Sequence, residues 1–70
     1  MKRLGDVVAV HGAVAVVACT EEPPDLDADV YDPSMDRVAA VVDLIGPTDA
    51  PYAVVGSAGG IDVGDRLYLR

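Results

Sequence analysis

The sequence predicts an all-β protein, a small six-stranded closed β-barrel that forms a single domain over residues 1–70. Thirteen of the 70 residues are valine, Phe and Trp are absent, and Gly and Pro recur along the chain. Branched side chains pack well on a pleated sheet and lose rotamer freedom in a helix, so this composition favours strands. Six short strands without a long helix are typical of a barrel, whose closure removes the free edges on which open sheets associate.

The first two expected strands, residues 4–10 and 13–19, form a hairpin. Both are apolar runs, and they join at His11-Gly12, where the glycine can take the positive φ that a tight turn requires. Residues 20–27 are expected to form a loop, because Pro23-Pro24 cannot donate to a strand ladder.

The next two expected strands are residues 29–32 and 37–45. The shorter one stops at a turn over residues 33–36, whose Asp and Pro residues suit a turn. The longer one ends where Gly46-Pro47-Thr48-Asp49 turns the chain again.

The last two expected strands are residues 51–56 and 66–69. The former begins at a proline, at the position where a missing N–H does least harm to a ladder. Residues 57–65 between them hold three glycines and are expected to be the most flexible stretch of the chain.

Length and charge exclude several functions. A chain of 70 residues buries only about 60% of its unfolded surface, which leaves little structure to support a catalytic cleft, so no enzymatic activity is expected. Twelve acids against five bases give a net charge of −7, the wrong sign for neutralising phosphates. The preference for Asp over Glu and the single Lys indicate adaptation to high salt.

The location of the protein is expected to be cytoplasmic, with no membrane partner. The chain has a single cysteine and no signal-peptide pattern, and no apolar run approaches the roughly 18 residues of a membrane span.

No catalytic, cofactor or metal site is expected. His11 is the only histidine and falls in a turn, and Cys19 lacks the further Cys or His ligands that zinc needs. Asp25, Asp27 and Asp29 alternate as in a calcium loop, but the later Gly and Glu are missing from their positions. The basic residues show no interleaving with aromatics, so direct contact with nucleic acid is not expected either.

The apolar residues outnumber those that one small interior can hold. Residues 7–10 and 13–19 are apolar at both strand parities, and Asp43 and Asp49 are the only charges over residues 38–58. We therefore expect an uncharged belt around part of the barrel, and such surfaces usually contact another protein. The alternative is that small Ala and Val side chains simply fill a tight barrel.

The segment 38–52 is the most informative part of this belt. A strand, a Gly-Pro corner and a Pro-Tyr re-entry would present Pro47, Pro51 and Tyr52 as a rigid surface with little entropy to lose on docking. In the alternative interpretation, Tyr52 covers one end of the barrel.

Several short strings, in this order and spacing, resemble one known family across Lys2–Leu69. They are Lys2-Arg3-Leu4-Gly5-Asp6-Val7, Glu22-Pro23-Pro24, Val30-Tyr31-Asp32, Val41-Val42-Asp43-Leu44-Ile45-Gly46-Pro47 with Pro51-Tyr52, and Leu67-Tyr68. The family is the archaeal glycine-arginine-rich-type small subunit of the box H/ACA ribonucleoprotein, which makes pseudouridine in RNA under guide-RNA direction.

The resemblance implies a barrel related to those of translation factors and a partner, the pseudouridine synthase catalytic subunit. The chain would associate with guide RNA and substrate rRNA only indirectly, and would assist substrate loading and product release. Ala39 stands where the family generally has Gly, and Ile45 replaces a usual Phe. The partner-binding residues implied are Val41, Asp43, Gly46, Pro47, Pro51 and Tyr52.

A second family is open as an alternative. Ribosome-maturation factors contain a similar barrel that docks on ribosomal protein, although that family does not account for the spacing of Gly46-Pro47 and Pro51-Tyr52.

Overall fold

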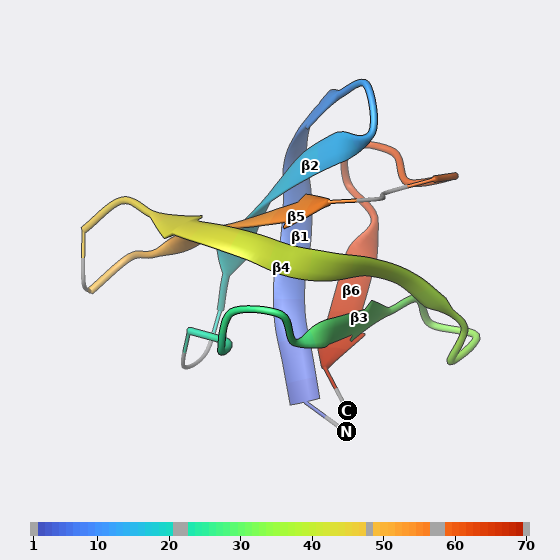
Figure 1. Cartoon of the computed structure of the whole chain (residues 1–70), viewed down its shortest axis with the longest axis horizontal. Coiled ribbons are helices and arrows are strands. Elements are labelled where there is room, and N and C mark those ends of the chain that lie inside the picture. The colour runs from blue at the N-terminus through green and yellow to red at the C-terminus, as the bar shows by residue number, and fades with distance from the viewer. Residues whose placement is uncertain (1, 21–22, 48, 57–58, 70) are drawn as a thin grey trace.

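The chain is all-β and its six strands close into an antiparallel barrel, as expected from the sequence (Figure 1). The structure is a computed structural model that describes residues 2–20, 23–47, 49–56 and 59–69. Around the barrel the strands follow the order β1-β2-β5-β4-β3-β6. Their bounds are β1 Lys2–His11, β2 Val14–Cys19, β3 Asp29–Tyr31, β4 Arg37–Ile45, β5 Tyr52–Gly56 and β6 Arg66–Leu69.

The β1–β2 hairpin turns one residue later than expected. His11 belongs to β1 and pairs with Val14, so the two turn residues are Gly12 and Ala13. Gly12 has a φ of 60° and occupies the first central position, where a type II′ turn takes glycine. The predicted turn at His11-Gly12 was wrong by one residue, because the β1–β2 ladder extends to His11, the residue before Gly12.

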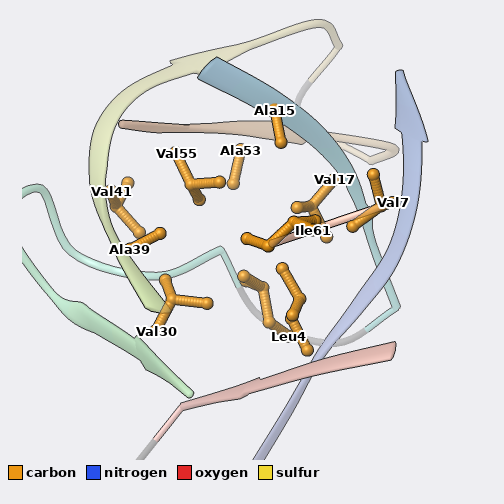
Figure 2. Close-up of a cluster of buried hydrophobic side chains, with 11 residues drawn as sticks. Leu4, Val7, Ala15, Val17, Val30, Ala39, Val41, Ala53, Val55 and Ile61 are labelled. Atoms are coloured by element: carbon orange, nitrogen blue, oxygen red, sulfur yellow. The ribbon is translucent and has the colours of Figure 1, made fainter. Parts of the chain in front are cut away.

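The core lies inside the barrel and consists of small aliphatic side chains (Figure 2). Away from register shifts, alternate strand residues point inward, so that Ala15 and Val17 of β2 are fully buried while Val14 and Val16 face out. The buried hydrophobic residues are Leu4, Val7, Ala15, Val17, Val30, Ala39, Val41, Ala53, Val55, Ile61 and Leu67.

The glycine-rich β5–β6 connection is anchored rather than loose over its described part. Ile61 is only 6% exposed and projects into the barrel among the strand side chains (Figure 2). The Gly64 N–H donates to the Val7 carbonyl at 2.8 Å, and the Val7 N–H donates to the Asp65 carbonyl at 2.9 Å. The expectation that residues 57–65 are the most flexible stretch did not foresee that Ile61 is buried and holds the loop to the barrel. Residues 57–58 lie outside the described residues.

Two β-bulges bring apolar side chains to the exterior. The register shifts between Val7 and Ala9 in β1 and between Val41 and Asp43 in β4. An extra residue in a bulge leaves the ladder and bends its strand. Here the extra residues are Val8 and Val42, which are 48% and 54% exposed.

Among the described glycines, Gly5 of β1 lies closest to a neighbouring backbone. A Cβ placed on Gly5 would lie 1.8 Å from the carbonyl oxygen of Ala18 in β2. Two bonded strands cannot move apart to admit it without losing their ladder, so only glycine fits at this position.

We expect Gly5→Ala to destabilise the barrel by more than about 4 kcal/mol, a large part of the total stability of a domain this size. Gly12→Ala is the matched control, because its Cβ would meet nothing within 4 Å and the substitution carries only the positive-φ cost of about 1 kcal/mol. Urea unfolding of both variants in the same salt measures the difference. A Gly5→Ala protein within about 1 kcal/mol of wild type would contradict the close approach.

Candidate functional site

The outer surfaces of β2, β5 and the second half of β4 form one continuous apolar face. The register makes Val16, Val54 and Asp43 neighbours in one cross-strand row, and it places Ala18, Tyr52 and Ile45 in the next row. Side chains directly opposite each other on neighbouring strands are in contact range. We call this surface the apolar face; its members are Val14, Val16, Ala18, Val42, Ile45, Tyr52 and Val54.

Much of the apolar face is open to solvent. The exposed fraction is 54% for Val42, 45% for Ile45, 38% for Val14 and 37% for Tyr52. Val8 of β1, also exposed, borders the face beside the β1–β2 ladder. An exposed apolar group of neighbouring side chains marks a contact surface more often than scattered single residues do.

Asp43 is the single charged residue on this face. Its carboxylate Oδ1 accepts a hydrogen bond from the N–H of Leu44 at 2.8 Å, and the side chain is exposed. The β-bulge at Val42 places Val42 and Asp43 next to each other on the outside. Glycine at position 56 makes room for Val42, because a Cβ there would lie 2.9 Å from Val42 Cγ1.

The β4–β5 hairpin (Figure 1) carries the part of the site that contains a hollow. Gly46 has a φ of 91°, and a Cβ added to it would lie 3.0 Å from Cδ2 of Tyr52, so the tyrosine ring rests against this glycine. Next to it lies a hollow of about 250 Å³. Its lining consists of Pro23, Leu44, Ile45, Gly46, Pro47 and Pro51.

Five of the six expected partner-binding residues lie at or beside this hairpin surface. Asp43, Gly46, Pro47 and Tyr52 are exposed, and Pro51 is half-buried and lines the hollow. Val41 must be removed from the set, because it is fully buried in the core. Val41 precedes the β-bulge and points inward, and a β-bulge cannot be read from an alternating apolar pattern.

The remaining members of the apolar face were missed as individual residues. Val14, Val16 and Val54 belong to strands that are apolar at both parities, so the pattern alone does not say which residues point outward. The pairing of β2 with β5 decides this, since it aligns Val16 with Val54 on the outside and Val17 with Ala53 on the inside.

Strand pairing brings together basic and aromatic residues that lie far apart in the sequence. Strand pairing places Arg3, Tyr68, Tyr31 and Arg37 in consecutive cross-strand positions over β1, β6, β3 and β4. These residues are far apart in the sequence, so only the closed topology brings them together.

His11 and Cys19 lie at opposite ends of the β1–β2 ladder. His11 sits at the exposed end of β1, and burial raises the pKa of the Cys19 thiol. Within residues 2–20, 23–47, 49–56 and 59–69, no group of three or more His, Cys, Asp or Glu side chains could hold a metal ion. The same part of the chain contains no helix long and apolar enough to cross a membrane.

Neither protein-family models nor curated proteins gave a match to this chain. The likeness to the H/ACA small subunit is therefore carried by the short strings quoted above and by their order.

We expect Gly46→Ala to destabilise the protein by about 1 kcal/mol more than Gly60→Ala. Both glycines have a positive φ, so both variants carry the backbone cost, but a Cβ at Gly60 meets nothing within 4 Å, whereas one at Gly46 displaces the ring of Tyr52. Unfolding free energies and the ring resonances of Tyr52 check this. Equal losses in the two variants would show that the ring does not depend on Gly46.

Proposed function

We propose that this protein is a non-catalytic accessory subunit that docks on a larger protein through the apolar face, and that the partner is the pseudouridine synthase catalytic subunit of an H/ACA ribonucleoprotein. The observation that supports docking is the continuous exposure of Val14, Val42, Ile45 and Tyr52 on one side of the barrel. The identity of the partner is supported by the family resemblance alone.

The apolar face has the properties of a rigid docking surface. Most of it lies on paired strands, so little backbone entropy is lost on binding. Tyr52 supplies a large amphipathic ring with few rotatable bonds, the kind of residue that often anchors interfaces. The hollow beside Pro47 and Pro51 could receive one side chain of the partner.

Charge sets a requirement on the partner. The chain carries a net charge of −7, and Asp43 is exposed within the apolar face. A complementary surface would be apolar at its centre, with a Lys or Arg opposite Asp43 and further basic residues at the rim. Such complementarity speeds encounter and excludes acidic competitors.

In this proposal the chemistry of pseudouridine formation belongs to the synthase subunit. The barrel binds beside the catalytic domain and assists substrate RNA loading and product release, in the compartment where rRNA is processed. The barrel comes close to guide RNA and substrate rRNA because the synthase subunit binds them, and not because the barrel has a basic RNA-binding surface of its own.

We expect Tyr52→Asp to weaken binding to the synthase subunit by at least about 30-fold, because a carboxylate would be desolvated without a partner at the centre of the contact. Val63→Asp is the matched control: Val63 is 63% exposed but lies outside the apolar face, so the affinity should stay within about twofold of wild type. Calorimetric titration of the two purified proteins gives both values, with circular dichroism as the check on folding.

Full binding by Tyr52→Asp would exclude the apolar face as the docking surface. If wild type itself does not bind the synthase, the partner assignment is wrong. Affinity capture from a native extract, with wild type and Tyr52→Asp side by side, then decides between two cases. A protein captured by wild type alone, such as a ribosomal protein, is a different partner, and no such protein means no docking at all.

A further inference from the structure

A cross-strand row of arginines and tyrosines lies on the side of the barrel away from the apolar face. Arg3 of β1 is paired with Tyr68 of β6, Tyr68 with Tyr31 of β3, and Tyr31 with Arg37 of β4. We call these four residues the Arg–Tyr row. In the closed barrel order, β6 lies opposite β5, which carries Tyr52, and β3 is separated from β5 by β4, so the two tyrosines of the row lie away from the apolar face and the two surfaces can be occupied together.

Strand alternation points the two tyrosines outward. Tyr68 follows Leu67, which is 1% exposed, and Tyr31 follows Val30, which is fully buried. Among the described side chains that make up the core or pack against it, neither tyrosine appears. Both tyrosines are half-buried, so part of each residue stays open to solvent.

Aromatic rings flanked by guanidinium groups are suited to unpaired bases. Every base has a π-face that can stack on a tyrosine, and arginine adds a cation–π contact or a phosphate contact. The row covers three inter-strand steps, about 14 Å in all. Sheets of RNA-recognition domains stack two or three bases on aromatics placed on neighbouring strands in this way.

The charges around the row decide how such binding would work. The Nε of Arg37 lies 2.7 Å from Oδ1 of Asp29, and that hydrogen bond and charge raise the pKa of Arg37. Arg66 and Asp6 lie nearby on the adjoining strands, with 3.6 Å between Nε and Oδ1. Asp32 and Asp36 also adjoin Tyr31 and Arg37 in the chain, so carboxylates at least match the arginines here and attraction of phosphates is weak. Stacking, which salt screens little, must supply most of the affinity.

We propose that the Arg–Tyr row is a contact site for unpaired bases of single-stranded RNA, weak and tolerant of salt. The stacking chemistry follows from the four side chains, and the choice of RNA over DNA rests on the proposed function. The site does not use the apolar face, so it adds a direct RNA contact to a subunit held in place by its protein partner.

The test is a titration of the ¹⁵N-labelled full chain with octa-adenylate RNA, followed by amide chemical shifts. We expect a Kd on the order of 0.1–1 mM, the weak end of non-specific binding, with shifts confined to β1, β6, β3 and the start of β4. Two neutralised phosphates at most give a slope of log K against log salt of about −1.4 or shallower. Octa-deoxyadenylate and an abasic oligomer of the same length are run alongside.

Tyr31→Leu and Tyr68→Leu should each weaken RNA binding by at least about fivefold, while Tyr52→Leu on the apolar face should leave it unchanged. If either row variant fails to fold, Arg3→Gln at an exposed position tests the same site and should make the salt slope shallower by about 0.7.

Three results would overturn the proposal: no binding at millimolar RNA, equal binding of the abasic oligomer, or unchanged affinity in both the tyrosine and arginine variants. A tenfold preference for DNA would overturn the assignment to RNA. Tyr52→Asp tests docking on the protein partner alone, and the row variants test RNA binding alone. A failure of the docking proposal can therefore be distinguished from a failure of the RNA proposal.

Discussion

The interior of this barrel is narrow, and its small volume limits the rest of the fold. Eleven hydrophobic side chains are buried in the described part of the chain, eight of them Val or Ala and none aromatic, although 51% of all residues are apolar. Strands pack at a fixed spacing, so six short ones enclose little space. The surplus apolar residues must point outward. Four of the eight exposed large hydrophobic residues in the described chain lie where β2, β5 and β4 are side by side.

This sorting gives the barrel two unlike halves. On the half formed by β2, β5 and the second half of β4, Asp43 is the single charged strand residue, whereas the described arginines lie on the other half, along β1, β6 and the start of β4; they are Arg3, Arg37 and Arg66. Acidic residues fill the loops and the turn between β3 and β4. One half is thus suited to exclude water against a protein, and the other keeps a solvated, mixed-charge surface.

Strand positions were predictable because Gly, Pro and Asp interrupt the apolar runs, and the bounds of β4 and β6 match the expected ranges. The composition also indicated that an outward apolar surface exists. Local pattern could not tell which valines form it, since β-bulges at Val8 and Val42 change the parity. Nor could it place Val41 and Ile61 in the core, or bring Tyr31 beside Tyr68, because these depend on pairing between distant segments.

The carboxylate of Asp43 also bears on self-association. β3 pairs with β4 only as far as Ala40, so within the described chain the stretch from Val42 to Ile45 has a ladder partner on its β5 side alone. By accepting the Leu44 N–H at 2.8 Å, Asp43 occupies the donor that a strand from another molecule would need. An unpaired apolar strand margin favours edge-to-edge association, so a charged side chain that occupies one of its donors makes pairing with a second chain less favourable and leaves the neighbouring valines available to a partner of different shape.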